Sequence, residues 1–302
     1  DVQQGKISYN EAYDIILDLW KKMALYEHGF QNVALGGSDI YGKDMCNDLT
    51  LMCMEASLAL RTEQPPIVLR VNRETPDLVW NKAFELIKTG IGMPAFINDE
   101  VAVKAKMNAG IEKKHAYDYS VVGCVELTVG GMEYSQTEGL RINWLKVLEL
   151  MFFGGQCPIT KNKWKLKEHH DLKKISTFEA FYDWYKTELV YVIEEACKFI
   201  RTLDKGYGKL WPIPFVSLLM EQCLEKGKDV TDGGTIYNNL SVNNAGMANT
   251  VDSLEAIRNL VFVEKVVGLS DIPSILSRNF EGFEAIREKA LSYPKFGNDM
   301  EV

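Results

Sequence analysis

Short apolar runs alternate with longer segments of helical periodicity along most of the chain. Runs of strand length occupy residues 32–37, 65–71, 93–99 and 119–125. Between them, helix-start signals and helical spacing predict helices over 8–26 and 42–60, and another that begins at Pro76 with Thr75 as its cap. Several of these strands are apolar throughout, which is typical of an α/β protein with a parallel sheet covered on both faces or closed into a barrel.

The second half of the chain is predicted to be mainly helical. Helices are predicted over residues 140–153, 178–203, 213–227 and 252–267, and the lysine-rich stretch 160–174 is predicted to be a solvated surface excursion. Active-site residues are expected in the loops at the strand ends.

Composition and charge narrow the class of protein. The 302 residues are 46% hydrophobic and 25% charged, as in a globular protein of one large domain or two ordinary ones. A net charge of −8 without a basic block argues against nucleic acid and anionic membrane surfaces as partners. The sequence carries no run of membrane-spanning length and no signal peptide. Because it begins with Asp1, we expect it to derive from a longer protein.

The cysteines and histidines do not suggest a metal site. Six cysteines are widely spaced and form no CxxC pair, and the four histidines complete no zinc pattern. A chain with a core of this size does not need disulfides, so we expect reduced thiols in a cytoplasm and no bound metal.

The segment GCVE, residues 123–126, is the strongest candidate for chemistry. Cys124 follows a strand-like run, and glycines on both sides allow the backbone to hold a thiol at a loop tip. A buried structural thiol is one alternative, a Cys–His hydrolase with His115 is another, and Glu126 alone would be explained by pairing with a cation. Glu138 and Arg141, three residues apart, are expected to form a local ion pair.

A series of motifs in one order adds a family resemblance. The chain contains LGGSDIYGKDMCNDLT, GIGMPAFINDE, VVGCVE, NWLKVLEL, CLEKGKDVTDGGTIYN, GMANTVDSLEAIRNLVF and PKFGNDMEV. Together they resemble the glycyl radical enzymes, in the branch related to pyruvate formate-lyase, nearly from end to end.

The resemblance implies an α/β fold, part of a ten-stranded barrel of two parallel half-sheets with surrounding helices and a central cysteine finger loop. It implies that residues 1–302 form a catalytic barrel segment. The glycine that stores the radical, in an RVxGY-like motif of a C-terminal domain, lies outside these residues, as does the N-terminal part of the barrel. The chain alone is therefore expected to be inactive.

The resemblance also implies site residues and partners. Cys124 would carry a thiyl radical and Glu126 would be the general base or acid, their i, i+2 spacing in extended chain placing both on one side of the substrate. No cofactor would be bound, and a radical S-adenosylmethionine activase would install the glycyl radical. A homodimer in the cytoplasm of an anaerobic bacterium is expected, with a small-molecule substrate.

The reaction is predicted from departures within the motifs. Diol dehydratases of the family follow GCVE with Pro-Gln and a TEGWHD stretch, whose His-Asp pair falls on Thr137 and Glu138 here. Choline-cleaving members carry Thr and Tyr at the positions of Thr137 and Arg141, and pyruvate formate-lyase has two adjacent cysteines where this chain has one.

We therefore predict radical elimination, with C–O cleavage favoured by Glu138, Arg141 available for a carboxylate or sulfonate, and Tyr237 lining the pocket. Decarboxylation of an arylacetate, C–N or C–S cleavage, formate acetyltransferase activity and a non-catalytic subunit or binding module are the alternatives.

Overall fold

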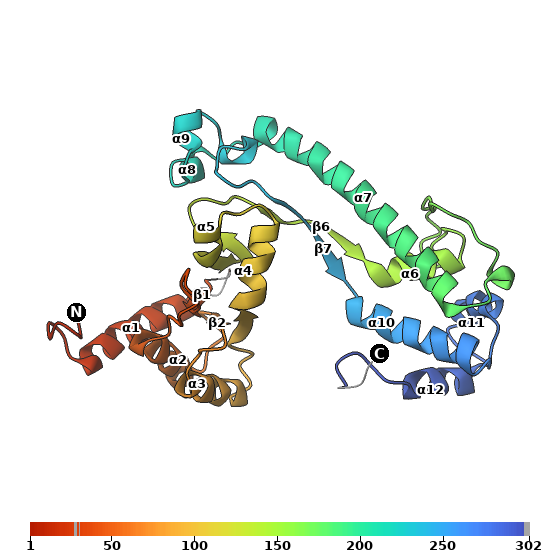
Figure 1. Ribbon diagram of the computed structural model, residues 1–302, viewed down its shortest axis with the longest axis horizontal. Coiled ribbons are helices and arrows are strands. Elements are labelled where there is room, and N and C mark those ends of the chain that lie inside the picture. The colour runs from red at the N-terminus through yellow and green to blue at the C-terminus, as the bar shows by residue number, and fades with distance from the viewer. Residues whose placement is uncertain (27–28, 30, 299–302) are drawn as a thin grey trace. The chain divides into compact units, whose positions relative to one another are not determined.

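A computed structural model describes residues 1–26, 29 and 31–298 of the chain. These residues form two compact units, which are described separately. Unit 1 comprises Asp1–Ser135 and Pro212–Asn239, and unit 2 comprises Gln136–Trp211 and Leu240–Val302. Figure 1 labels most of the helices and some of the strands of both units.

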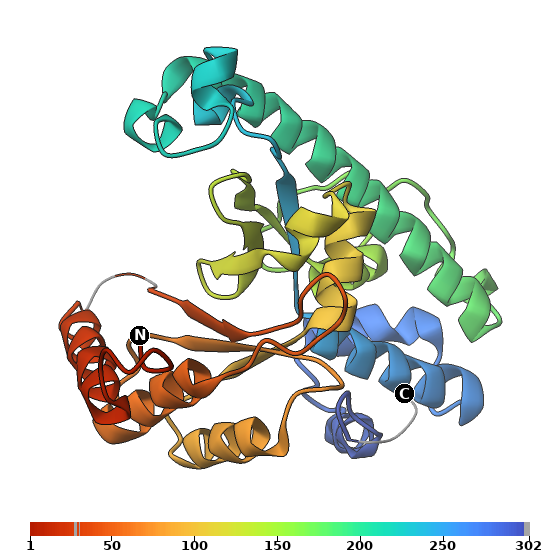
Figure 2. The ribbon, with the colours of Figure 1, turned by 60° about the vertical axis from the view of Figure 1, so that its left-hand side comes forward.

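Unit 1 is built on a three-stranded parallel sheet with the strand order β1-β2-β3. The strands β1 (Val33–Gly36), β2 (Ile67–Val71) and β3 (Ala95–Asn98) alternate with the helices α1 (Tyr9–Ala24), α2 (Asp48–Leu60), α3 (Asp77–Lys88) and α4 (Asp99–Asn108). Figure 2 shows the three strands lying side by side. The predicted α/β alternation is therefore found, in a sheet of three strands.

The central strand β2 is buried along its whole length, and its two faces differ. Ile67, Leu69 and Val71 share a core with Trp20 of α1 and Met54 of α2. Since neighbouring side chains of a strand point to opposite faces, Arg70 is directed away from this core. This places one cation inside an otherwise apolar strand.

Helix starts in unit 1 agree with the sequence in one case and differ in two. Ser8 and Glu11 form the predicted capping box of α1. The helix predicted over 42–60 begins only at Asp48, because Asn47 caps it. The predicted cap Thr75 is wrong: Pro76 is the N-cap of α3, and the Thr75 hydroxyl instead donates to Asp44 at 2.9 Å.

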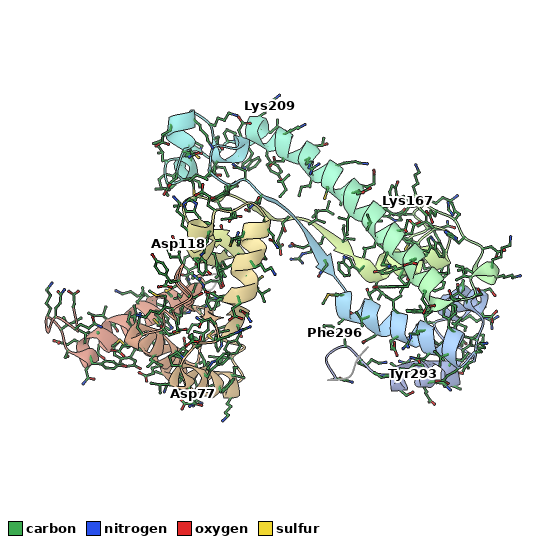
Figure 3. The ribbon with its side chains drawn as sticks, in the orientation of Figure 1. Asp77, Asp118, Lys167, Lys209, Tyr293 and Phe296 are labelled. Atoms are coloured by element: carbon green, nitrogen blue, oxygen red, sulfur yellow. The ribbon has the colours of Figure 1, made fainter. Side chains whose placement is uncertain are left out.

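An antiparallel hairpin follows the short helix α5 (Lys113–Tyr117). Its strands are β4 (Tyr119–Val122) and β5 (Glu126–Val129). The strand predicted over 119–125 is thus too long, because the chain turns at residues 123–125. Asp118, labelled in Figure 3, is the residue before β4 and marks the base of the hairpin.

The second segment of unit 1 begins at Pro212. The sequence predicts one helix there over 213–227, but the segment forms two short helices. They are α8 (Pro214–Ser217) and α9 (Cys223–Lys226), followed by a 3-10 turn at Val230–Asp232. The interruption has a backbone cause, since Gln222 has φ of 71°, in the left-handed region that a helix cannot contain.

Unit 2 pairs two parallel strands, β6 (Gln136–Asn143) and β7 (Leu240–Ala245). Its helices are α6 (Trp144–Phe152), α7 (Phe178–Leu210), α10 (Met247–Ile257), α11 (Ile272–Ser277) and α12 (Glu284–Ser292). One π-helical turn, Arg258–Val263, and 3-10 turns at Leu172–Lys174 and Leu269–Asp271 complete it. The core of this unit joins α6, α7 and α10 through residues such as Leu148, Phe181 and Leu254.

Two predictions for unit 2 are corrected by these elements. The helix predicted from residue 140 begins at Trp144, because Leu140–Asn143 pair with β7. The stretch 160–174 is only partly a solvated excursion, since Leu166 is buried and Glu188 of α7 accepts hydrogen bonds from the backbone of Lys167 and Glu168. Within the described residues, no helix combines the length and apolar character needed to span a bilayer.

Candidate active site

The hairpin holds Cys124 at the middle of a three-residue loop, residues 123–125, which we call the thiol loop. Val122 and Glu126 are opposite one another at its two ends. The loop turns sharply because Gly123 has φ of 62°. Cys124 is exposed there, so the alternative of a buried structural thiol is wrong.

The carboxylate of Glu126 folds back onto the thiol loop. Its Oε2 accepts a hydrogen bond from the backbone N–H of Val125 at 3.1 Å. A Cβ atom on Gly123 would lie only 2.5 Å from the same oxygen, so the absence of a side chain there makes room for the acid. Among the described residues Glu126 forms no ion pair, which removes the interpretation that it serves a neighbouring cation. The thiol of Cys124 and the carboxylate of Glu126 therefore lie two residues apart at one turn.

The two groups are close for a reason that differs from the predicted one. The i, i+2 spacing was expected to act through extended chain, whereas residues 123–125 form a turn. Asn32, just before β1, also holds this turn, because its Nδ2 donates to the Gly123 carbonyl. The Oδ1 of Asn32 is buried and has no hydrogen-bond partner within the part of the chain that the structure describes.

His115 has a partner other than Cys124. Its Nδ1 lies 2.8 Å from the hydroxyl of Tyr237, which also accepts a hydrogen bond from the backbone of Glu112 at 3.2 Å. Tyr237, predicted to line a substrate pocket, is therefore engaged with α5 at the foot of the hairpin. This contact gives the Cys–His hydrolase alternative no support.

A buried ion pair lies at the base of β4. Arg70 donates from Nε and Nη2 to the two carboxylate oxygens of Asp99, each at 2.9 Å. Its Nη1 donates to the carbonyl of Tyr119 at 2.8 Å, and its guanidinium lies 3.8 Å from the centre of the Tyr119 ring. The Tyr119 hydroxyl donates to Asp99 at 2.6 Å. One ion pair thus binds the side chain and the backbone of the first hairpin residue.

A second buried ion pair lies at the base of β5. Lys106 of α4 contacts Glu133 at 2.6 Å and donates to the carbonyl of Leu127 at 2.8 Å. Glu133 also accepts hydrogen bonds from the backbone of Val129 at 2.9 Å and from Asn239 at 2.7 Å. The second strand is therefore held at both Leu127 and Val129.

The charges of both pairs are maintained by their hydrogen bonds. Burial raises the pKa of Asp99, but the bonds from Arg70, Tyr119 and Ser38 outweigh burial and hold this pKa below its usual value. Burial also raises the pKa of Glu133, but its hydrogen bonds, of which that from Lys106 is the strongest influence, outweigh burial. The pKa of Glu133 is therefore lowered as well. Burial, with the bond to Asp99, raises the pKa of Tyr119, whose phenol stays protonated.

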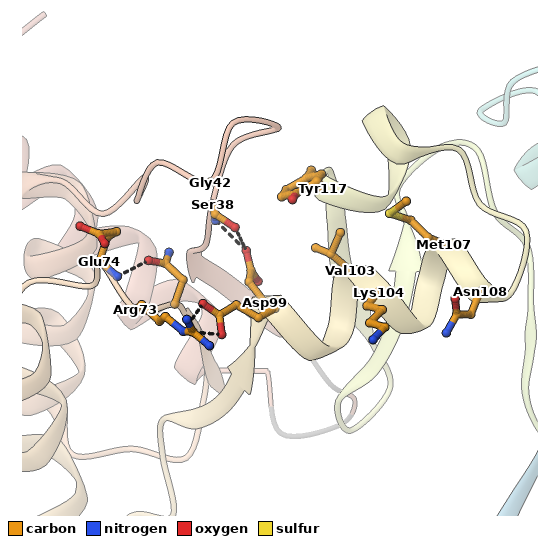
Figure 4. Close-up of a pocket in the computed structure, with 12 residues that line it drawn as sticks. Ser38, Gly42, Arg73, Glu74, Asp99, Val103, Lys104, Met107, Asn108 and Tyr117 are labelled. Carbon is orange, nitrogen blue, oxygen red and sulfur yellow. Dashed lines mark hydrogen bonds and ion pairs between the residues drawn. The ribbon is translucent and has the colours of Figure 1, made fainter.

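A cavity of about 500 Å³ lies at the carboxyl ends of the parallel strands of unit 1. Ser38, Asn72 and Asp99 line it, each located where a strand ends. Figure 4 shows the Asp99 carboxylate hydrogen-bonded to Ser38. Arg73 forms an ion pair with Glu100 at 3.0 Å. Ser38 and Asp99, and likewise Arg73 and Glu100, are thus engaged with each other in this wall.

The other predicted binding residues belong to unit 2. Thr137, Glu138 and Arg141 lie on β6, not at a helix start. Arg141 and Glu138 form the predicted local ion pair, with 61% and 47% of their side chains exposed. The pair forms although three residues separate its members on a strand, because the register with β7 shifts between Gln136 and Leu140. The carbonyl of Thr137 accepts a hydrogen bond from Asn243 at 3.0 Å.

Arg141 also lines a cavity of unit 2. This cavity, of about 670 Å³, lies between β6, α6, α7 and the loop that contains Leu166. Its wall is mainly apolar, with Arg141, Lys146 and Lys165 as cations.

The ion pairs at the hairpin base were missed in the sequence. Arg70 carried a signal, because a cation inside the apolar run PPIVLRV must find a partner when that strand is buried. Lys106 and Glu133 carried none, since each lies among ordinary polar residues. In the described residues, no group of three or more metal-ligating side chains comes together.

Comparison with known proteins confirms the predicted resemblance. The family described as PFL-like, pyruvate formate lyase-like, matches residues 1–302. A (2S)-3-sulfopropanediol dehydratase from Klebsiella oxytoca is 33% identical over 261 residues, which cover 85% of this chain and 31% of that protein. A trans-4-hydroxy-L-proline dehydratase from Clostridioides difficile is 30% identical over 315 residues, 99% of this chain and 40% of that protein.

Solved structures agree with these relatives. The glycerol-bound B12-independent glycerol dehydratase from Clostridium butyricum matches with a TM-score of 0.85 at 30% identity, over 98% of this chain and 39% of that one. A glycyl radical enzyme from Archaeoglobus fulgidus matches with a TM-score of 0.83 at 29% identity. The chain thus spans between 31% and 40% of the length of the relatives it matches.

Proposed function

Because the chain belongs to the pyruvate formate lyase-like family, we propose that it supplies the thiol loop of a glycyl radical enzyme that eliminates a leaving group from a small polar substrate. The observation that carries the proposal is the loop itself. Cys124 is exposed at its centre, and the carboxylate of Glu126, which forms no ion pair with any described residue, accepts a hydrogen bond from the loop backbone at Val125.

The two side chains divide the chemistry between them. A glycyl radical elsewhere in the protein takes the hydrogen atom of the Cys124 thiol, leaving a sulfur radical. This sulfur abstracts hydrogen from a substrate carbon, since S–H and activated C–H bonds have similar strengths. Glu126 accepts the proton of the adjacent hydroxyl, the neighbouring group leaves with its bonding pair, and the product radical regains hydrogen from Cys124. Enclosure of this step excludes water and oxygen.

We favour a hydroxyl as the leaving group, which is C–O cleavage. Glu138 would donate the proton with which that hydroxyl leaves as water. Arg141 would hold a carboxylate or sulfonate of the substrate, in exchange for its present partner Glu138. Thr137 and Tyr237 are each proposed to contact the substrate. The names of relatives support this class, because they include dehydratases of a sulfopropanediol and of hydroxyproline.

A complete barrel and two partners belong to the same proposal. The chain supplies five parallel strands, three in the sheet β1-β2-β3 and two in β6-β7, which is half of the proposed ten. The rest of the barrel, and the glycine that stores the radical, would lie in residues outside this chain. A radical S-adenosylmethionine activase would install that radical, and we propose a homodimer in an anaerobic cytoplasm.

Substitution of the two loop residues tests the proposal. In the complete, activated protein, Cys124→Ala and Glu126→Gln are each expected to reduce turnover by at least about 10³-fold, because each removes a group that bonds to the reacting atoms. The matched controls Cys197→Ala and Glu225→Gln are expected to retain turnover. Substrate loss is measured against diols, hydroxyproline, choline, isethionate and arylacetates.

Two results would contradict this assignment. Substantial turnover by Cys124→Ala would remove the thiol from the mechanism. Conversion of choline, isethionate or an arylacetate, with no activity on a hydroxylated substrate that loses water, would move the reaction to C–N, C–S or C–C cleavage.

A further inference from the structure

The thiol loop lies at the tip of the hairpin β4-β5, so a change in the direction of the hairpin at its base moves the loop. Val122, the last residue of β4, is three residues beyond Tyr119, so at the rise of an extended strand the thiol loop begins about 10 Å from Tyr119. A tilt of roughly 6° at the base would displace the loop by about 1 Å, and a displacement of that size can slow a positioned reaction on the order of 10²-fold. The direction of the hairpin therefore matters at its base.

Apolar packing alone does not fix that direction. Tyr119 and Val129, which face each other across the base, are fully buried against Val103 and Ala116. Such contacts favour burial but are not directional. Hydrogen bonds to a charged group are directional and strong, and they define where a backbone lies.

Each strand of the hairpin receives such bonds from a different buried ion pair. The guanidinium of Arg70 binds the Tyr119 carbonyl, and the carboxylate of Asp99 binds the Tyr119 hydroxyl. On the other strand, the ammonium of Lys106 binds the Leu127 carbonyl, and the carboxylate of Glu133 binds the Val129 N–H. In both pairs, therefore, cation and anion each contact the hairpin.

The burial of these ions argues for a role beyond stability. The side chains of Asp99 and Glu133 are 1% and 2% exposed, and those of Arg70 and Lys106 are 10% and 9% exposed. An apolar replacement of a buried ion pair is often as stable as the pair, so stability alone does not call for two of them under one hairpin. Specification of a single geometry is the better explanation.

We propose that the ion pairs Arg70–Asp99 and Lys106–Glu133 position the hairpin, and through it hold Cys124 at the distance from substrate that hydrogen abstraction requires. This inference rests on the function proposed above for Cys124. The four side chains are positioning residues, which act on the reaction only through β4 and β5.

Two variants loosen the hairpin base with matched controls. Tyr119→Phe removes only the bond to Asp99, whose oxygens keep their bonds from Arg70 and Ser38, so this variant is expected to fold. Tyr117→Phe, two residues away, removes a hydroxyl without a hydrogen bond in the described residues. Lys106→Met breaks the second pair, and Lys104→Met alters an exposed lysine of the same helix α4.

Three measurements separate positioning from stability. In the complete, activated protein, kcat is divided by the amount of glycyl radical measured by electron paramagnetic resonance, which gives kcat per spin. Tyr119→Phe and Lys106→Met are expected to lower this value by at least about tenfold, with KM changed less than threefold. Amide hydrogen exchange of residues 119–129 is expected to be faster in the resting protein. The melting temperature reports any loss of fold, and both controls should match wild type in all three measurements.

The possible results distinguish this inference from the proposed function. Normal kcat per spin in Tyr119→Phe and Lys106→Met, together with an inactive Cys124→Ala, would overturn the positioning role and leave the function intact. An active Cys124→Ala would overturn the function first. Unchanged hydrogen exchange in both variants would overturn the positioning role without any reference to activity.

Discussion

At the scale of single residues, the site depends on the position that has no side chain. Gly123 supplies the left-handed backbone of the thiol loop and leaves the space that the Glu126 carboxylate occupies. The same residue accepts the Asn32 side-chain bond through its carbonyl. The geometry of the two side chains proposed to react thus depends on a residue that has no side chain.

Gly123→Ala is expected to lower turnover strongly, whereas the matched control Gly130→Ala is expected to retain it. The added Cβ would lie 2.5 Å from Glu126 Oε2 and would strain a backbone with φ of 62°, so the carboxylate must leave the loop. Turnover should fall by at least about 10²-fold, since geometry of this kind contributes several orders of magnitude. Gly130→Ala is the matched control, because no atom lies within 4 Å of its added Cβ. Equal turnover of the two variants would contradict the role given to Gly123.

The sequence predicts Cys124 and Glu126 as the reacting residues and places Tyr237 and Arg141 among the candidates, but it does not reveal the ion pairs that hold the hairpin. Arg70 and Asp99 are 29 residues apart, and Lys106 and Glu133 are 27 apart. Neither pair shares a helix turn or a strand face, so local spacing contains no sign of them. They meet because the parallel strands and α4 bring them to the base of the hairpin, which is a property of tertiary structure.

At the scale of elements, the strands with apolar runs were predicted well and the polar strand was missed. β1, β2 and β3 fall inside the predicted runs, since parallel strands covered by helices are apolar. β6, with the sequence QTEGLRIN, is polar at several positions and finds its partner β7 about a hundred residues later. Periodicity within a short window cannot detect such a pairing.

A buried carboxylate on helix α7 holds the loop of residues 160–174 against that helix. Glu188 is fully buried, and its oxygens accept bonds from the backbone of Lys167 and Glu168 and from the indole of Trp184. Glu188→Ala should leave these donors unsatisfied and lower the free energy of unfolding by about 3 kcal/mol. Glu194→Ala, an exposed position of α7, should change it by less than about 0.5 kcal/mol.

Urea unfolding of the two variants followed by tryptophan fluorescence measures this difference. Trp184 lies against Glu188 and reports directly on unit 2. Equal unfolding midpoints for Glu188→Ala and Glu194→Ala would show that the loop of residues 160–174 is held by other contacts.

At the scale of the whole molecule, the described residues form only small parallel sheets. β6 and β7 pair only with each other within the described residues, and a two-stranded sheet is marginal in water. Parallel strands are normally buried on both faces and flanked by further strands. The chain also spans only 31% and 40% of the length of the two dehydratases compared with it in sequence. These facts support a barrel that other residues complete.

If the storage glycine and the rest of the barrel lie outside this chain, as proposed, the 302-residue chain and the complete protein should differ in activity. The 302-residue chain alone, treated anaerobically with a radical S-adenosylmethionine activase, should show neither turnover nor a glycyl doublet in its electron paramagnetic resonance spectrum. The complete protein should show both, and Cys124→Ala in that protein should retain the doublet while losing turnover, because the stored radical and the reacting sulfur are on different residues. A doublet from the isolated chain would place the storage glycine within these 302 residues and overturn the proposed arrangement. Loss of the doublet in Cys124→Ala would instead make the thiol part of radical storage, which the geometry of an exposed loop does not require.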